Sequence, residues 1–394
     1  MKELHTDILI VGGGLTGLMA AYTLSALKKK IIIIDRFDFR LKTNNSDFRT
    51  TAISEGSKQF FNKINIWHHL SGYAEKIKYI CVNDRNRSRN INFQNLNSNG
   101  FLGYIINNNL IKQILIKNLK NKKNIKIITN QSFISMNNNN NFVDTFFNDY
   151  KITSSLLVAA DGKKSSIRNK LKLPIFKKNY THKAIVVNFH HTKDHKNTAC
   201  ELFFKSGPLA ILPMKKIKKN LFSSSVIWSN ENSFISNLEK VNKSFLKLIL
   251  QEKIYLYVGD IEEIVNSQTF DLSAHINFKF YDQRLLFIGD SAHSIHPIAG
   301  QGWNLGVRDI KNCYQVLSEA QTLGLDIGSA FVCKKYNDLC YHDAFNLYQI
   351  TDKLNSIFIN DSFFVNSLRF LGFNFIEKNK KIKKFITNYA MGLN

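Results

Sequence analysis

The chain has 394 residues, and 54 Lys and Arg against 30 Asp and Glu give a formal net charge of +24. A hydrophobic content of 44% with 31 Phe residues excludes a mainly disordered chain, because disordered segments are poor in aromatic side chains. The 19 Gly and 4 Pro residues exclude a collagen-like chain. The length predicts one large domain or a few ordinary ones with a substantial core.

The cysteines show no CxxC spacing and are odd in number, so we expect free thiols rather than a zinc site or a disulfide framework. They are Cys81, Cys200, Cys313, Cys333 and Cys340. The first apolar strand begins a few residues after Met1, so we expect no signal peptide. Because no apolar run is long enough for a transmembrane helix, we expect a cytoplasmic protein that could lie peripherally on the inner face of a membrane.

The positive charge is spread over the whole chain together with many Asn and Ile residues. This distribution indicates a compositional bias, and we expect no specific nucleic-acid partner. Lys is denser at 117–126 and 378–384, and both stretches could be solvated faces. The second follows an aromatic-rich segment at 358–375, so it could instead hold the chain on an anionic membrane, at about 1 kcal/mol per Lys or Arg.

Apolar periodicity predicts the elements in chain order. A buried strand, a glycine turn, a helix and a second buried strand occupy the first 35 residues, which is a β-turn-α-β unit. A strand and a helix follow from 104, an Asn-rich turn lies at 136–141, and buried strands are expected at 154–162 and 284–293. Short strands between 176 and 274 favour an antiparallel sheet, and residues 329–394 are expected to be helical.

These elements predict an α/β fold with two domains, in an α+β arrangement with C-terminal helices. A discontinuous Rossmann-like nucleotide-binding domain would comprise 1–75, 104–175 and 275–340. An inserted antiparallel β-sheet domain would comprise 76–103 and 176–274. The remainder, 341–394, would form a C-terminal helical region.

The first chemical motif is Gly12-x-Gly14-x-x-Gly17, which follows a strand and opens a helix. In this context Gly12 permits the tight turn, Gly14 lets the backbone approach a pyrophosphate, and Gly17 lets helix and strand pack closely. The N–H groups at the helix start, at Leu15 and Thr16, would face the phosphates.

Asp35 ends the second strand, 18 residues after Gly17, with Arg36 beside it. A carboxylate at this place can accept both ribose hydroxyls of an adenosine. The same negative charge disfavours a 2′-phosphate, so we do not expect NADP as the resident cofactor.

The second motif begins at Gly289-Asp290 and ends in a glycine turn that opens a long helix. Asp290 could bind a polyol such as a ribityl chain, and the helix start near Gly302 and Asn304 could face a group that gains negative charge, such as the N1–C2=O edge of a reduced flavin. His293 and His296 lack further metal ligands, so we expect loop histidines and no metal. The candidate contacts of this segment are Asp290, Pro297, Gly300, Gln301, Gly302, Trp303 and Asn304.

Two shorter motifs are less specific. Asp161-Gly162 follows a strand and precedes Ser165 and Arg168, which is typical of a polar clamp near a cofactor or of a turn with a helix cap. Arg49 could reach a phosphate or a flavin edge, or it could be an ordinary surface arginine.

The four motifs together resemble the single-component FAD-dependent aromatic hydroxylases, the relatives of p-hydroxybenzoate hydroxylase, and within them the ubiquinone-biosynthesis branch that acts on polyprenylated phenols. VGGGLTGLMAAYTL, VAADGKKSSIR and FIGDSAHSIHPIAGQGWNLGVRD are similar to the family's three FAD motifs, and FRTTAIS, LGYIINNNLI, GPLAILPM and the C-terminal tail resemble that branch. The resemblance covers nearly the whole chain. The departures are Asp35 for the commoner Glu, Asn107 where an acid is common, Ala159 where Gly is usual, and Trp303 at a variable position.

The resemblance implies a Rossmann-like FAD-binding domain, a substrate-binding sheet domain and a monooxygenase activity. FAD would be resident, O₂ the co-substrate, and NAD(P)H or another electron donor a transient reductant. A C4a-hydroperoxyflavin would hydroxylate the ring of a polyprenylated phenol, which a membrane contact or a ubiquinone-biosynthesis complex would deliver. Besides the second motif, the implied FAD contacts are Gly12, Gly14, Leu15, Thr16, Gly17, Asp35, Arg36, Arg49, Asp161 and Gly162.

The inserted sheet would cover the flavin and keep it dry. Phe203, Leu209, Leu212 and Trp228 are candidate pocket walls or plain core, because the sequence does not tell which face of each strand meets a ligand. No catalytic side chain can be named for flavin-centred chemistry. Two alternatives stay open, a hydroxylase of a small soluble aromatic and a non-catalytic FAD-binding subunit of a membrane-associated complex. The ring position, prenyl length, electron donor and oligomeric state also stay open.

Overall fold

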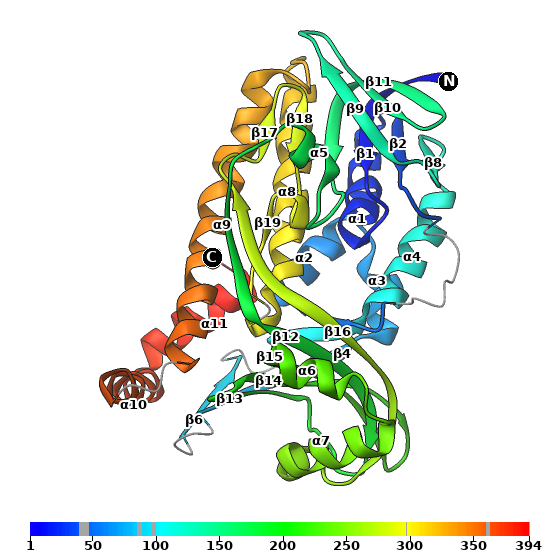
Figure 1. The fold of residues 1–394 in the computed structure, drawn as a ribbon. Coiled ribbons are helices and arrows are strands. Elements are labelled where there is room, and N and C mark those ends of the chain that lie inside the picture. The colour runs from blue at the N-terminus through cyan, green and yellow to red at the C-terminus, as the bar shows by residue number, and fades with distance from the viewer. Residues whose placement is uncertain (39–46, 85–88, 96–99, 297, 360–362, 394) are drawn as a thin grey trace.

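The structure is a computed structural model that describes residues 1–38, 47–84, 89–95, 100–296, 298–359 and 363–393 (Figure 1). Within these residues the strands form two eight-stranded sheets and one three-stranded sheet. The predicted α/β fold, with a parallel nucleotide-binding sheet, an antiparallel sheet and C-terminal helices, is confirmed.

The first sheet has the order β17-β18-β11-β1-β2-β8, with β9 and β10 attached to β11. Its central pairs are parallel, as expected for strands that are continuous apolar runs, and β2 is four buried Ile residues. The strand expected at 284–293 is shorter, because a turn at 289–291 ends the pairing. The strands are β1 (Lys2–Val11), β2 (Ile31–Ile34), β8 (Ile125–Ile128), β9 (Phe133–Asn138), β10 (Val143–Phe147), β11 (Tyr150–Ala159), β17 (Tyr281–Asp282) and β18 (Leu285–Phe287).

The second sheet has the order β19-β16-β12-β15-β14-β13-β5-β6 and is antiparallel except where β13 and β5 pair in parallel. In Figure 1 the two long strands β12 and β16 run from the upper part of the molecule into this lower sheet. The predicted antiparallel sheet is therefore confirmed. Its strands are β5 (Tyr79–Asp84), β6 (Arg89–Gln94), β12 (Ile175–His191), β13 (Thr198–Phe204), β14 (Gly207–Lys218), β15 (Leu221–Glu231), β16 (Ile261–Asn277) and β19 (His293–Ser294).

Two helices that the sequence analysis did not predict, α6 (Asn232–Leu238) and α7 (Lys243–Val258), cover the outer face of the second sheet (Figure 1). The buried residues of α7 follow a helical spacing of four, which is the signal that was missed. They are Leu246, Leu250, Ile254 and Val258.

The remaining elements surround the first sheet. A small sheet holds β3 (Thr50–Ser54), β7 (Gly103–Asn107) and β4 (Glu75–Ile77) in that order. The expected C-terminal helices are confirmed, and none of the described helices combines the length and hydropathy needed to cross a bilayer. The helices are α1 (Leu15–Leu24), α2 (Glu55–Lys63), α3 (Trp67–Leu70), α4 (Asn108–Lys120), α5 (Ser166–Lys170), α8 (Gln301–Thr322), α9 (Ala330–Ile359), α10 (Phe363–Lys378) and α11 (Lys380–Met391).

The strands of the first sheet all come from the three segments that we assigned to the nucleotide-binding domain, and we retain that division as a proposal. β12 and β16 cross the proposed boundaries near 176 and 274 without a break. The two parts are therefore joined by paired strands and not by a linker.

Candidate functional site

The glycine turn after β1 leaves no room for side chains on its inner side. Gly12 has a φ of +119°, and a Cβ there would lie 2.2 Å from the carbonyl oxygen of Ala160. A Cβ on Gly17 would lie 1.9 Å from the Gly12 oxygen, so α1 packs directly on the turn. Both positions therefore require glycine for close packing.

Gly14, in contrast, has free space where a side chain would be. It is exposed, and a Cβ there would meet nothing within 4 Å. Gly14 is also the N-cap of α1, where no side chain accepts a hydrogen bond from the first turn. The amide groups at Leu15 and Thr16 therefore begin a helix with an uncapped end and open space in front of it, which suits an anion.

The Asp35 carboxylate lies beside this turn. One oxygen accepts a hydrogen bond from the Gly13 amide at 2.6 Å, and the other accepts one from the Phe37 amide at 2.8 Å. Each carboxylate oxygen keeps a further lone pair for a ligand hydroxyl. Arg36 is exposed and lies over the Phe37 ring at 4.8 Å.

Asp161 lies at the end of β11, against the glycine turn. One oxygen accepts hydrogen bonds from the Ser166 and Ile167 amides at 2.8 and 3.3 Å, and the other is buried without a partner. Burial outweighs these hydrogen bonds and raises the pKa of Asp161. Gly162 has a φ of +81° with open space around its Cα. An unsatisfied oxygen beside open backbone marks a place for a hydrogen-bond donor.

Arg168 joins this motif to the second one. It is buried, and its guanidinium donates to the Ser291 carbonyl at 3.1 Å and to the Lys163 carbonyl at 2.7 Å, and contacts His275 Nε2 at 2.9 Å. Ser165 is the N-cap of α5 and accepts a hydrogen bond from the Arg168 amide at 3.1 Å, so the alternative of a turn with a helix cap is what the structure shows.

The turn at Gly289-Asp290 is fixed by a residue of α8. Asp309 accepts a hydrogen bond from the Gly289 amide at 2.8 Å and contacts His293 Nε2 at 2.6 Å. Burial acts to lower the pKa of His293, but Asp309 outweighs it and raises that pKa. His293 therefore has its partner within the protein, as expected, but it lies on the short strand β19 and not in a loop.

The Asp290 side chain is exposed and has no hydrogen-bond or ion-pair partner among the described residues. A Cβ on Gly289 would lie 2.8 Å from the Thr16 side chain, so the first two motifs are in contact. The carboxylate that was predicted to bind a polyol is therefore free, next to the start of α1.

The glycine turn at the start of α8 has a different character. Gly300 has a φ of +60°, Gly302 has an unobstructed Cα, and Gln301 donates to the Ala390 carbonyl at 3.1 Å. Trp303 packs edge-on against Phe61 at 5.5 Å. Pro297 lies outside the described residues.

The Asn304 side chain is fully occupied within the protein. Its oxygen accepts from the Ser54 amide at 2.9 Å and the Ser57 hydroxyl at 2.8 Å, and its nitrogen donates to the carbonyls of Ala52 and Gly300 at 2.8 and 3.2 Å. These four bonds fill the amide's capacity. Asn304 therefore positions the start of α8, and only its backbone can meet a ligand.

Arg49 lies on the far side of the same region. It forms a two-pronged ion pair with Asp47 at 2.7 and 2.8 Å and lies over the Phe270 ring at 5.0 Å. Burial acts to lower the pKa of Arg49, but Asp47 and, more weakly, Asp290 raise it. The predicted arginine is therefore in the electrostatic range of the second motif.

The four candidate pocket residues divide between the two faces of the second sheet. We call the inner face the one that carries Asn188, whose amide donates to the Phe48 carbonyl at 2.8 Å, and Phe270. Phe203 and Leu212 lie on the inner face, where Phe203 packs near Ile298.

Leu209 and Trp228 lie on the outer face, in the core beneath α6 and α7. Their assignment as pocket walls is corrected, because residues that are an odd number of positions apart on one strand point to opposite faces. Leu209 is three positions from Leu212, so the two cannot line one pocket.

Sequence reasoning also missed Glu201, which lies on the inner face of β13 between Ala199 and Phe203. The signal was an acidic residue within the apolar run CELFF. No group of three or more potential metal ligands occurs in the described part of the chain.

Comparisons with known proteins agree with this geometry. Ubiquinone hydroxylase UbiL of Rhodospirillum rubrum is 29% identical over 388 residues, which cover 98% of this chain and 89% of that protein. Ubiquinone biosynthesis monooxygenase COQ6 of Dictyostelium discoideum is 25% identical and covers 99% of this chain and 92% of its own length. The 3-demethoxyubiquinol 3-hydroxylase of Escherichia coli is 23% identical over the full length of both chains.

Among solved structures, p-nitrophenol 4-monooxygenase PnpA from Pseudomonas putida superposes with a TM-score of 0.79 at 14% identity and covers 100% of this chain and 99% of its own. At that identity the likeness shows the shared fold. The family model described as FAD binding domain matches residues 5–323, which is most of the chain. The expected resemblance is thus confirmed, and the chain belongs to the FAD binding domain family.

Proposed function

We propose that the chain is an FAD-dependent monooxygenase that hydroxylates the aromatic ring of a polyprenylated phenol in ubiquinone biosynthesis. The observation that carries this proposal is that all four sequence motifs meet at one place, beside the inner face of an apolar sheet. The near-complete coverage by three relatives named for ubiquinone biosynthesis supports the choice of substrate.

The residues present fit FAD. The open backbone at Gly14 and the uncapped start of α1 suit the pyrophosphate, and Asp35 suits the adenosine ribose. The unpartnered oxygen of Asp161 and the free carboxylate of Asp290 suit donors such as the ribityl hydroxyls. Bound FAD would supply the activation of O₂, after reduction by NAD(P)H or another electron donor.

The protein's own contribution is to position the reactants and exclude water. Asn304 and Asp309 fix the second motif with buried hydrogen bonds, so the loops of the site are preorganised. The inner face of the second sheet adds apolar side chains, among them Val186, Ile227 and Leu212. Such a surface suits a ring with a prenyl tail and keeps the reaction dry.

The test is mass spectrometry of quinone lipids from cells that lack this gene and from cells complemented with it. We expect ubiquinone to fall and a prenylated phenol that lacks one oxygen to accumulate, with both effects reversed by complementation. An unchanged quinone-lipid profile in a strain without a second hydroxylase would favour the alternative that the substrate is a small soluble aromatic.

Asp290→Ala separates an enzyme from a non-catalytic FAD-binding subunit. Because the side chain is exposed and unpartnered, the variant should fold normally, bind FAD about tenfold or more weakly, and fail to restore ubiquinone. Asp271→Ala, at an exposed carboxylate of β16, is the matched control and should behave as wild type. Full complementation by folded Asp290→Ala would favour the scaffold role.

Delivery of a prenylated substrate needs a membrane surface or a partner that carries lipids. We propose a peripheral membrane contact through α10 and α11, where exposed apolar and basic residues lie together. These are Leu371, Phe375, Lys378, Lys381, Lys384 and Phe385.

A further inference from the structure

Glu201 is the acidic residue that sequence reasoning overlooked. On β13 its neighbours Cys200 and Leu202 pack in the core beneath α6 and α7, so the alternation of the strand directs Glu201 to the inner face. The side chain is only partly exposed, and in the described part of the chain no hydrogen bond or ion pair reaches its carboxyl group.

A continuous row of directly paired residues crosses the inner face at this level. Glu201 pairs with Val82 on β5 and with Ala210 on β14, and the row continues to the far edge of the sheet. In order it reads Val82, Glu201, Ala210, Ile227, Val186 and Gln268. Glu201 is therefore the one acidic residue of this row. The row is apolar from Ala210 to Val186 and ends in Gln268, whose side-chain oxygen is buried without a partner.

The row lies next to the loop that precedes α8. Phe203, the next inner-face residue of β13, shares an apolar cluster with Ile298 of that loop, and Val82 packs against the same cluster. At the other end, Phe270 follows Gln268 by one inner-face position and lies under Arg49. A ligand on this row would therefore contact both the sheet and the proposed FAD site.

Burial raises the pKa of Glu201 to about 8, and no cation offsets it. On the neighbouring strand β5, Asp84 pairs with Phe203 in the sheet register, and its carboxylate forms an ion pair with Arg369 of α10 at 3.9 Å. At pH 7 a minor fraction of Glu201 is therefore the carboxylate, which is the form that can accept a proton, and this fraction grows as the pH rises toward 8.

We propose that Glu201 binds the hydroxyl group of the aromatic substrate and accepts its proton as the ring is hydroxylated, which rests on the function proposed above. An unpaired carboxyl in apolar surroundings is costly, and a phenol would supply the missing partner. The proton moves from the phenolic oxygen to a Glu201 carboxylate oxygen, which leaves the ring more electron-rich. The apolar remainder of the row would contact the ring and the start of the prenyl tail.

The test compares wild type, Glu201→Gln and Glu201→Leu as FAD-loaded proteins, with 2-farnesylphenol and its methyl ether as probes. Wild type should bind the phenol about tenfold more tightly than the ether, which lacks the donor. Glu201→Leu should lose that preference. Glu201→Gln keeps an acceptor but not a base, so KM should stay near wild type while kcat falls and its rise toward pH 8 disappears.

Glu263→Gln, at an exposed position of β16 in the same sheet, is the matched control and should match wild type. Flavin absorbance and melting temperature report whether each variant is folded and loaded. Equal discrimination between phenol and ether by wild type and Glu201→Leu would overturn the proposal. Binding discrimination without any hydroxylation by wild type would instead overturn the proposed reaction and leave the Glu201 contact supported.

Discussion

Cys81 and Cys200 lie directly opposite each other on the parallel strands β5 and β13. The hydrogen bond between the two thiols lowers the pKa of Cys81 to about 7 and, together with burial, raises that of Cys200. Cys81 is also partly exposed, while the other four cysteines are buried. Because the thiolate is the nucleophile, Cys81 should be more reactive than the other cysteines, although all five are free thiols.

We therefore predict that iodoacetamide alkylates Cys81 before the other cysteines of the native protein. The rate should rise through about pH 7, since the lowered pKa places thiolate formation there. Peptide mass spectrometry over pH 5–9 measures this, and Cys81→Ser is the control that should remove the fast phase. A rate that rises only above pH 8, as for an ordinary thiol, would contradict it.

Single residues were predictable where their role is set within a few neighbours. Gly12, Gly17 and Asp35 follow a buried strand, and the backbone turn that they require is local. The face on which a sheet residue lies was not predictable in the same way. Leu209 and Trp228 are core because α6 and α7 cover them, and the sequence analysis did not predict these two helices.

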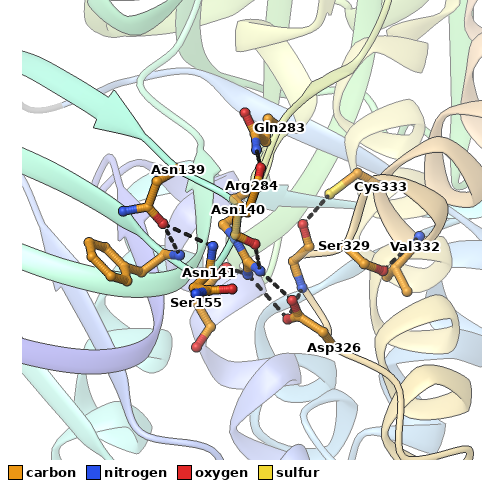
Figure 2. A network of polar contacts seen from close by, with 12 residues as sticks. Asn139, Asn140, Asn141, Ser155, Gln283, Arg284, Asp326, Ser329, Val332 and Cys333 are labelled. Atoms are coloured by element: carbon orange, nitrogen blue, oxygen red, sulfur yellow. Dashed lines mark hydrogen bonds and ion pairs between the residues drawn. The ribbon is translucent and has the colours of Figure 1, made fainter.

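At the scale of elements, Arg284 binds three segments that lie 42 to 144 residues away from it in the sequence (Figure 2). Its buried guanidinium donates to the carbonyl oxygens of Asn140, at the tip of the β9–β10 hairpin, and Ser155 on β11, and it pairs with Asp326 in the loop between α8 and α9. The Asn-rich stretch at 136–141 was predicted as a turn or a hairpin tip, and it forms the tip between β9 and β10. Its contact with Arg284 was not predicted. The hairpin tip is held in place by Arg284, which lies 144 residues after Asn140 in the sequence.

Replacing Arg284 by Met should destabilise the protein by about 2–3 kcal/mol, because buried carbonyl oxygens lose their donors. Differential scanning calorimetry would show a melting temperature lower by several degrees. Burial acts to raise the pKa of Asp326, but Arg284 outweighs burial and holds this pKa below its ordinary value. The contribution of the ion pair to stability is therefore present above pH 3.8 and is lost as the pH falls further. The difference in melting temperature between wild type and Arg284→Met should therefore become smaller below that pH.

Lys335→Met is the control for this experiment. Lys335 pairs with Glu319 at 2.7 Å, but both side chains are more than 40% exposed. Exposed ion pairs contribute little, so this variant should melt within about a degree of wild type. Equal losses in the two variants would mean that the Arg284 network adds no more than a surface pair.

At the scale of the whole molecule, the C-terminal helices are part of the site framework. Met391 of α11 shares an apolar cluster with Ile77 and Ile105, and the Ala390 carbonyl accepts the hydrogen bond from Gln301 at the start of α8. The sequence indicated helices here but not this docking, which needs the assembled small sheet. Deleting residues 377–394 would therefore disturb the proposed FAD site as well as any membrane contact.

The exposed side of these helices suits an anionic surface. Leu371, Phe375 and Lys378 share one face of α10 at helical spacing, and both apolar side chains are about 60% exposed. Lys381 and Phe385 repeat the combination on α11. Figure 1 shows both helices at one margin of the molecule, near β6.

Charge reversal tests this surface without removing the docked helix. Lys378→Glu, Lys381→Glu and Lys384→Glu together should weaken co-sedimentation with vesicles containing anionic lipid by more than tenfold, because each Lys near such a surface contributes about 1 kcal/mol. Added salt should weaken wild-type binding in the same direction. The matched control reverses Lys117, Lys120 and Lys123, an equally charged and exposed set at the end of α4. If both triple variants lose binding equally, only the net charge of +24 matters and the C-terminal surface has no special role.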